Sequence, residues 1–302
     1  MTELVVCSGK GGTGKTSVTA GLAALARDFV LADCDVDAAN LHLVLNPEVE
    51  TTTEFRAGHL ARIDPKACDG CGVCRDLCRF SAIDLTDGAD GEQTFRVRDL
   101  LCEGCGVCVR FCPGEAIDLV GQRCGEWYRS RTPFGPMVHA SLDVGAENSG
   151  KLVTLVREQA GLVAEQAGLD LILLDGPPGI GCPVTAAVTG ADLVLLVTEP
   201  SLSGLHDLER IVALADHFEV PAVVCINKHD LSPRLTRRIE EFCELRGLDL
   251  LGRIPFDPAV NDAQAAGRSI IEFAPHSETA EVLTSLWSRL EYRLSDTSLP
   301  KG

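Results

Sequence analysis

Short, largely apolar runs alternate with longer amphipathic segments along most of the chain. Such runs occur at 4–7, 30–32, 171–174, 193–197, 222–226 and 248–251, and segments with helical apolar spacing occur at 150–167, 204–217, 233–246 and 277–294. A strand that is apolar on both sides is buried on both faces, which is typical of parallel sheets between two layers of helices. The pattern therefore predicts an α/β fold with a mostly parallel sheet.

Two of the expected helices have a clear buried side. After the first strand, Val18 and Leu22 fall on one side of a helix. The last segment repeats apolar residues from Leu283 to Leu294 at helical spacing, and Ser277 just before it is a typical N-cap. Both helices are expected to pack on the sheet.

The middle of the chain differs from both flanks because it is rich in cysteine. Eight of the 14 cysteines lie between Cys68 and Cys112. A Cys-x-Gly-Cys-Gly-Val-Cys pattern begins at Cys68 and again at Cys102, and each copy leads to an Ala-Ile-Asp-Leu sequence, which indicates an internal duplication. We therefore expect a small module inserted at 61–122 into a larger α/β domain formed by 1–60 and 123–302.

A glycine-rich loop follows the first expected strand and precedes the first helix. The sequence from Gly9 to Thr16 fits G-x-x-x-x-G-K-S/T, the phosphate-binding loop. In such a loop, backbone N–H groups face phosphate oxygens, Lys15 neutralises the terminal phosphates, and Thr16 is placed to ligate Mg²⁺. A glycine-rich turn without a ligand is the alternative. The expected nucleotide contacts are Gly11, Gly12, Thr13, Gly14, Lys15, Thr16 and Ser17.

The loop carries a second lysine, Lys10, in the sequence K-G-G-T-G-K-T. This variant resembles the loop of the MinD, ParA and nitrogenase iron-protein class of ATPases, and the resemblance extends from Leu4 to about Leu290. It implies a P-loop ATPase that binds ATP and Mg²⁺ and forms a nucleotide sandwich dimer with itself or with a related ATPase. In such a dimer Lys10 would reach the phosphates of the facing subunit. A solvated loop lysine is the alternative.

The same resemblance gives roles to acidic residues at strand ends. Asp35, in the segment from Asp33 to Asp37, looks like the switch I residue that orients or deprotonates the attacking water. Asp175, in Asp-Gly-Pro-Pro-Gly, looks like the switch II residue that holds Mg²⁺ through water. Both roles suit phosphoryl transfer, which depends on positioning and charge. Turn acids that only cap helices are the alternative.

Two further segments resemble the base-side loops of this class. Asn227 and Lys228 follow an expected strand, at the position from which the family's asparagine hydrogen-bonds adenine. Pro255 and Asp257 lie in a segment that resembles the second base-side loop. An asparagine that only caps a strand end is the alternative.

Each cysteine run has the spacing C-x₂-C-x₂-C-x₃-C, with Pro113 after the second run and Arg79 after the first. Three thiolates of a run can hold one cubane while the fourth, beyond a turn, reaches the other cluster. The module therefore resembles a small α+β ferredoxin of bacterial type with two [4Fe–4S] clusters. One cluster is assigned to Cys68, Cys71, Cys74 and Cys112, and the other to Cys102, Cys105, Cys108 and Cys78. Structural zinc is the alternative.

Cys182 follows Asp175 at the offset where the nitrogenase iron protein carries a cluster ligand. A third cluster that bridges two subunits would need a second cysteine per subunit, and Cys124, in an expected loop, does not align well. A buried thiol or a switch element is therefore the favoured interpretation of Cys182. The cysteines expected only to pack in the core are Cys7, Cys34, Cys225 and Cys243.

Composition and charge narrow the functional classes. Lysine and arginine number 27 against 44 aspartate and glutamate residues, and the resulting net charge of −17 disfavours nucleic-acid binding. The chain has no apolar run long enough for a membrane span and no signal-peptide pattern, so we expect a cytoplasmic protein. Thiols stay reduced there, so clustered cysteines indicate metal or redox chemistry rather than disulfides.

Three functions agree with these features. The expected one is an ATPase that couples nucleotide-dependent dimerisation to electron transfer, or to metallocofactor assembly, on a partner protein that the sequence does not identify. The second is an iron–sulfur cluster carrier ATPase like Mrp, although the C-terminal Cys-x-x-Cys pair of that class is missing. The third is a spatial organiser like MinD with a redox sensor, but 277–302 mixes acidic with basic residues, unlike a basic membrane-binding helix.

Overall fold

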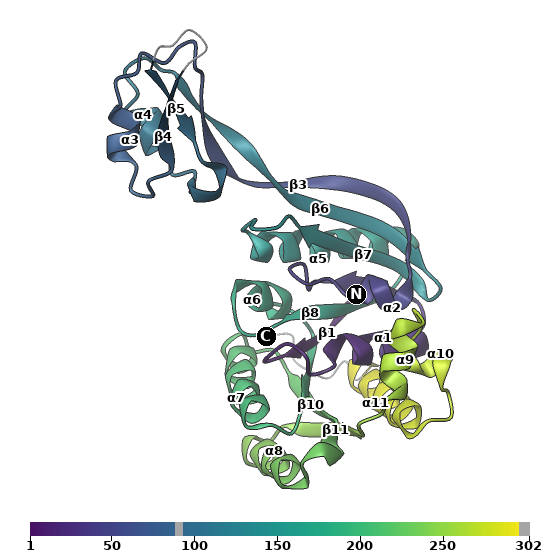
Figure 1. Cartoon of the computed structure of the whole chain (residues 1–302). Helices are drawn as coiled ribbons and strands as arrows, with labels where there is room; N and C mark the ends of the chain where they lie inside the picture. The colour runs from purple at the N-terminus through teal and green to yellow at the C-terminus, as the bar shows by residue number, and fades with distance from the viewer. Residues whose placement is uncertain (88–92, 296–302) are drawn as a thin grey trace. The chain divides into compact units, whose positions relative to one another are not determined.

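The computed structural model describes residues 1–87 and 93–295 and contains two compact units (Figure 1). The first unit comprises Met1–Thr53, Glu126–Leu142 and the chain from Ser149 onward. The second comprises Glu54–Gly125 and Asp143–Asn148. The sequence-based limits of the insert, 61 and 122, lie inside the first segment of this second unit.

The described residues form one sheet of nine strands in the order β11-β10-β9-β1-β8-β2-β7-β6-β3. Every recorded pair among β1, β2 and β7 to β11 is parallel. The expected parallel sheet is therefore confirmed. The strands are β1 (Thr2–Ser8), β2 (Phe29–Asp33), β3 (Glu48–Ile63), β6 (Ile117–Thr132), β7 (Gly135–Leu142), β8 (Leu171–Pro178), β9 (Leu193–Thr198), β10 (Ala222–Asn227) and β11 (Asp249–Ile254).

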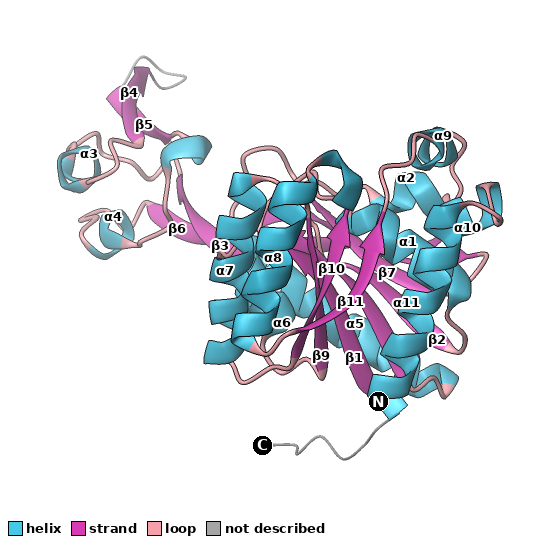
Figure 2. Cartoon of the chain, turned by 90° about the horizontal axis from the view of Figure 1, so that it is seen from below, coloured by secondary structure: helices cyan, strands magenta, loops and turns pink. Residues whose placement is uncertain are grey.

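Helices cover both faces of this sheet (Figure 2). On one side α1 packs against α10 and α11, and on the other α5 packs against α6 and α7 against α8. The helices of the first unit are α1 (Lys15–Leu25), α2 (Leu41–Leu45), α5 (Ser149–Ala167), α6 (Cys182–Val188), α7 (Leu202–His217), α8 (Pro233–Arg246), α9 (Ala259–Ala265), α10 (Ile270–Phe273) and α11 (Glu278–Ser295). All the helices expected from apolar spacing are present.

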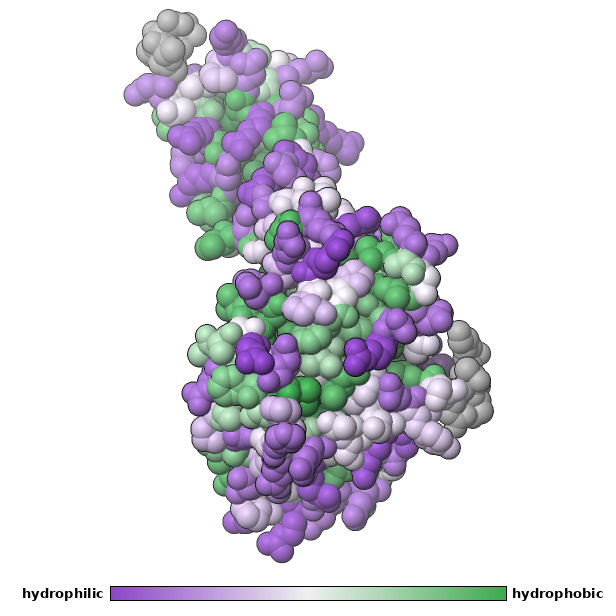
Figure 3. Space-filling model, turned by 90° about the vertical axis from the view of Figure 1, so that its right-hand side faces the viewer, coloured by the Kyte–Doolittle hydropathy of each residue, from purple (hydrophilic) through white to green (hydrophobic). Residues whose placement is uncertain are grey.

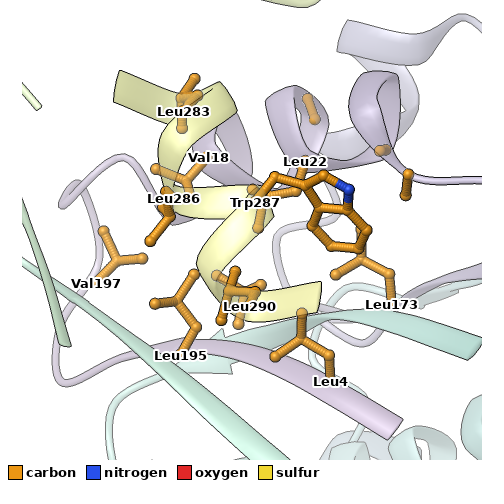
Figure 4. Close-up of a cluster of buried hydrophobic side chains, with 14 of the residues drawn as sticks. Leu4, Val18, Leu22, Leu173, Leu195, Val197, Leu283, Leu286, Trp287 and Leu290 are labelled. Atoms are coloured by element: carbon orange, nitrogen blue, oxygen red, sulfur yellow. The ribbon is translucent and has the colours of Figure 1, made fainter. Parts of the chain in front are cut away.

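A large hydrophobic core lies where α11 and α1 meet the sheet. Ser277 begins α11 as expected, because its Oγ accepts the N–H of Ala280 at 3.2 Å. Trp287 and Leu290 are buried, and apolar burial of this kind supplies most of the stability of such a helix. Figure 4 shows Leu283, Leu286, Trp287 and Leu290 facing Val18, Leu22, Leu4, Leu173, Leu195 and Val197.

Three strands of the nine-stranded sheet were not expected from the sequence, namely β3, β6 and β7. The first seven residues of β3, from Glu48 to Glu54, are all exposed, so no apolar alternation marks that half of the strand. Only two residues separate β6 from β7, and neighbouring strands joined so tightly must be antiparallel. This hairpin places Cys124 within a strand, which corrects its assignment to a loop.

The second unit has its own small core. An antiparallel pair, β4 (Ile83–Asp87) and β5 (Gln93–Val97), accompanies the short helices α3 (Val73–Leu77) and α4 (Val107–Arg110) and a 3₁₀ turn at Asp99–Leu101. Its core consists of Ala61, Cys74, Ile83, Phe95, Val97 and Ile117, against which Cys68, Cys78, Cys102, Cys108 and Cys112 pack. Six of the eight clustered cysteines thus belong to this core or pack against it.

The surface mixes hydrophilic with hydrophobic side chains over the face that Figure 3 shows. Within 1–87 and 93–295, no helix combines the length and apolar character that crossing a bilayer requires.

Candidate functional sites

The glycine-rich loop connects β1 to α1. Gly14 has a φ of 90°, and a Cβ at this position would lie 2.2 Å from Nδ2 of Asn227. Glycine is needed here because the loop closes directly against that amide. No side chain of the described residues caps α1, so its first N–H groups remain available to an anion.

A cavity of about 630 Å³ lies in front of this loop, at the edge of the sheet where the parallel strands end. Its wall combines the residues that follow β1, β2, β10 and β11. All the expected contact residues line it, namely Gly11, Gly12, Thr13, Gly14, Lys15, Thr16, Ser17, Asn227, Lys228, Pro255 and Asp257, together with Asp35. The structure therefore brings together segments that are far apart in the sequence.

Sequence reasoning missed several residues of this cavity. Phe256, Val260, Asn261 and Gln264 also line it. Gln264, on α9, donates from Nε2 to the Oγ of Ser17 at 2.6 Å. Val260, Asn261 and Gln264 carry no local motif, because they reach the cavity only through the packing of α9. Phe256 instead lies between Pro255 and Asp257, in the segment that resembles a base-side loop.

Asp175 is fully buried under the loop and receives three donors. Thr16 Oγ1 donates to its Oδ2 and Thr19 Oγ1 to its Oδ1, each at 2.8 Å, and Lys15 Nζ lies 2.9 Å from Oδ1. Lys15 Nζ is also 3.6 Å from Oδ2 of Asp35. Burial disfavours the charge of Lys15, but the two carboxylates outweigh that effect and raise its pKa. Lys15 therefore stays protonated.

Thr19 was not expected to take part, and it gives a first prediction. Thr19→Val keeps the shape but removes the donor to Asp175, so the apparent Mg²⁺ affinity in ATP hydrolysis should fall by about tenfold. Thr19→Ser should retain it. Titration of the hydrolysis rate with Mg²⁺, beside thermal unfolding of each variant, measures this. An unchanged Mg²⁺ dependence in Thr19→Val would contradict the positioning role.

Asp33 lies beside Asp175 in the neighbouring strand. Its Oδ1 accepts the N–H of Asp35 at 3.1 Å, and its buried Oδ2 has no hydrogen-bond partner among the described residues. Burial and the negative charge of Asp175 raise the pKa of Asp33 to about 8. Burial also raises the pKa of Asp35, against the opposing effect of Lys15. The Thr16 hydroxyl and the carboxyl groups around Lys15 form an oxygen-rich set, and oxygen is the donor type that Mg²⁺ takes.

Asn227 and Asp257 line the cavity, but their side chains contact the protein's own backbone. Asn227 Nδ2 donates to the carbonyl of Thr13 at 2.7 Å, and its Oδ1 accepts the N–H of Lys228 at 3.0 Å. Asp257 Oδ1 accepts the N–H of Ala259 at 2.9 Å. The adenine contact of Asn227 stays a prediction.

Lys10 lies apart from the other predicted site residues. It does not line the cavity, and its Nζ is 2.7 Å from Oε1 of Glu199. The structure thus gives Lys10 a partner within its own chain, which the sequence did not indicate.

Two small cavities in the second unit are each lined by four cysteines. One set is Cys68, Cys71, Cys74 and Cys112, and the other is Cys78, Cys102, Cys105 and Cys108. Each set combines three cysteines of one run with the last cysteine of the other run. This is the crossed grouping that the spacing predicts.

The duplication is visible in the contacts of the last cysteine of each run. The N–H of Ala82 donates to Sγ of Cys78, and the N–H of Ala116 donates to Sγ of Cys112, each at 3.3 Å. Bonds of this kind orient a thiolate ligand and influence the reduction potential of a cluster. The last cysteine of each run therefore accepts an equivalent backbone hydrogen bond beside both cavities.

Four thiols around each cavity match a cubane in donor type and number. No three His, Cys, Asp or Glu side chains in the described part of the chain lie at the distances of ligands to one metal ion. A cubane differs from a single ion because each thiolate binds a different iron, so its four ligands stand further apart. The cysteines present therefore fit the group that their spacing predicts.

The remaining cysteines differ from one another. Cys182, at the start of α6, is exposed, so its interpretation as a buried thiol is wrong. Cys124 is buried and donates to the carbonyl of Ala57 at 3.1 Å. The cysteines expected to pack in the core are indeed buried, namely Cys7, Cys34, Cys225 and Cys243.

Comparison with known proteins gives a consistent picture. A family model described as the CobQ/CobB/MinD/ParA nucleotide binding domain matches residues 4–270. An uncharacterized protein of Methanocaldococcus jannaschii is 35% identical over 233 residues, which are 76% of this chain and 79% of that protein. An iron-sulfur cluster carrier protein of Aquifex aeolicus is 29% identical over 133 residues, 39% of this chain and 36% of that protein. The solved structure of the septum site-determining protein MinD with Mg-ADP from Pyrococcus horikoshii OT3 shares the fold, with a TM-score of 0.58, 19% identity and 97% coverage of each chain.

Proposed function

We propose that this chain, which belongs to the family of CobQ/CobB/MinD/ParA nucleotide-binding domains, is an ATPase. Its nucleotide state is coupled to two [4Fe–4S] clusters in its second unit. Through them it serves electron transfer, or metallocofactor assembly, on a partner protein. The observation that carries the proposal is the grouping of eight cysteines into two crossed sets of four, on the same chain as a phosphate loop.

ATP binds in the cavity with its phosphates on the loop from Gly11 to Ser17. Lys15 exchanges its carboxylate partners, Asp175 and Asp35, for phosphate oxygens. Thr16 and Asp175 would hold Mg²⁺, which when bound would supply positive charge against the transferred phosphoryl group. Asp35 orients the attacking water and accepts its proton while the water oxygen bonds to the γ-phosphorus and the bond from that phosphorus to the leaving ADP oxygen breaks. This assignment rests on the oxygen-rich set beside Lys15.

Two bound nucleotides join two subunits in this proposal, with Lys10 of each subunit reaching the phosphates in the other. The resemblance of the lysine-bearing loop to that of MinD and ParA ATPases, which implies a nucleotide sandwich dimer, supports this step. The clusters, when bound, supply one-electron redox chemistry. The thiolates of the two sets hold them, and the N–H groups of Ala82 and Ala116 orient two of these thiolates.

The chain connects switch I directly with the second unit. The carbonyl of Val36 accepts the N–H of Leu142 at 3.1 Å, and the next residue, Asp143, begins the return of the chain into the second unit. Asp143 in turn donates its N–H to the carbonyl of Cys124 at 2.9 Å. A movement of switch I on γ-phosphate contact is therefore transmitted to Leu142 and Asp143, which supports coupling between nucleotide and cluster.

Coupling gives a second prediction. A state that binds ATP more tightly when the clusters are reduced is also easier to reduce when ATP is bound. We expect the midpoint potential of at least one cluster to differ by about 100 mV between Mg·ATP and Mg·ADP. Asp35→Ala should keep the ATP-bound shift but block its relaxation, because the phosphate loop is intact. Redox titration followed by electron paramagnetic resonance measures both.

Identical titration curves with the two nucleotides, together with an ATP affinity that does not depend on cluster oxidation, would contradict direct coupling. A cluster carrier is then the second candidate, and the partial match to an iron-sulfur cluster carrier protein favours it. Transfer of cluster iron to an apo-ferredoxin within minutes, accelerated by ATP, would distinguish a carrier from an electron-transfer ATPase, whose clusters stay on the chain.

A further inference from the structure

The ammonium group of Lys10 is fully satisfied within its own chain. Its Nζ lies 2.7 Å from Oε1 of Glu199, 3.1 Å from Oγ of Ser201 and 2.9 Å from Oγ of Ser203. An ammonium group has three N–H donors, and three acceptors surround this one. All three acceptors follow β9 at the start of α7, so one short segment holds Lys10.

Glu199 also contacts a second lysine, Lys228, which lines the nucleotide cavity. Its Oε2 lies 3.4 Å from Nζ of Lys228, which donates to the carbonyl of Gly12 at 3.1 Å. Glu199 is partly buried, yet its bonds with Lys10 and the charges of both lysines lower its pKa, so it is ionised. Lys228 has a left-handed backbone, with a φ of 54°, which is uncommon for a residue other than glycine.

These contacts form one continuous link from Lys10, through Glu199 and Lys228, to the phosphate loop. Lys228 and Gly12 line the nucleotide cavity, whereas Lys10 and Glu199 do not. Nucleotide phosphates that reach the loop bring negative charge beside Lys228 and compete with Glu199 for it. The arrival of a stronger anion beside the loop also competes with Glu199 for Lys10, and so weakens the hold of Glu199 on that lysine.

The geometry points to Glu199 as a latch that keeps Lys10 inside its own subunit while the cavity is empty. Nucleotide binding opens the latch, and the released ammonium becomes available to a facing subunit. This inference rests on the proposed function, in which Lys10 acts across a dimer. The latch stabilises the nucleotide-free monomer. By linkage, the same free energy is lost from the binding of nucleotide and of the second subunit.

The first test measures the chemical reactivity of the Lys10 amine and requires neither dimerisation nor hydrolysis. The protein has six lysines, and Lys66 and Lys151 are exposed references. Competitive acetylation with an excess of acetic anhydride, read by mass spectrometry, should label Lys10 about fivefold faster in Glu199→Gln than in the unmodified chain, a change equal to about 1 kcal/mol. Equal labelling of Lys10 in the two proteins, with unchanged references, would overturn the latch.

The second test connects the latch to assembly. Light scattering at a subsaturating concentration of a non-hydrolysable ATP analogue should show a larger dimer fraction for Glu199→Gln than for the unmodified chain. Glu209→Gln, an exposed change on α7, is the matched control. In the Lys10→Ala background, Glu199→Gln should add nothing, because the group that it releases is gone.

The outcomes separate the latch from the proposed function. If Glu199→Gln labels faster at Lys10 but shows no gain in dimer fraction, the Glu199 contact is only a structural ion pair. This outcome would overturn the latch. An equal gain in the Lys10→Ala background would also overturn it. An unmodified chain that stays monomeric with every nucleotide would instead refute the dimer of the proposed function, and with it the purpose of the latch.

Discussion

Lys15→Ala is expected to reduce kcat/KM for ATP by about 10³-fold, which corresponds to about 4 kcal/mol. Lys15 is the residue whose ammonium lies at the centre of the site, beside Asp175 and Asp35. Without it the phosphates would meet those carboxylates with no cation between them except Mg²⁺. Nucleotide affinity, measured by isothermal titration calorimetry, should fall together with hydrolysis.

The matched control for this change is Lys151→Ala, which removes an exposed lysine of α5. It should leave affinity and turnover unchanged. Lys15→Ala should also lower the free energy of unfolding by about 3 kcal/mol in the absence of nucleotide, because it leaves the buried Asp175 without its cation. A Lys15→Ala protein that still binds ATP normally would exclude this lysine from the phosphate site.

The parts of the fold that the sequence predicted are those with a local physical signature. A strand such as β9 is apolar from Leu193 to Val197 because it is buried on both faces, and α11 repeats leucine at the helical period. β3 lacks this signature because its first half is exposed on both faces. Its pairing depends on β6, a strand far away in the sequence, so no local pattern could indicate it.

In the candidate sites, too, the predictable features were those with a local sequence signature. The phosphate loop and the crossed cysteine sets were predictable because short spacings constrain which backbone groups or thiolates can face one ligand. The partners of Lys10 were not, since Glu199 and Ser203 come from the other half of the chain. Thr19 was missed for a similar reason: it lies on a helix face that only the packing of β8 turns into the surroundings of Asp175.

The cluster assignment gives the remaining large effect. After anaerobic purification or reconstitution, the chain should carry about eight iron and eight acid-labile sulfide. Stoichiometric zinc without sulfide would refute the assignment. Cys243→Ser, which removes a buried thiol of α8, is the control and should leave these numbers unchanged.

Two double variants test the crossed grouping itself, because Cys74 and Cys112 line one cavity whereas Cys74 and Cys78 line different ones. Cys74→Ser with Cys112→Ser damages a single set, so about four iron per chain should remain. Cys74→Ser with Cys78→Ser removes one ligand from each set, so both clusters should become labile and the iron content should fall well below that of the first pair. If each run instead held its own cluster, the order of the two variants would be reversed, since Cys74 and Cys78 would then belong to one site and Cys74 and Cys112 to two.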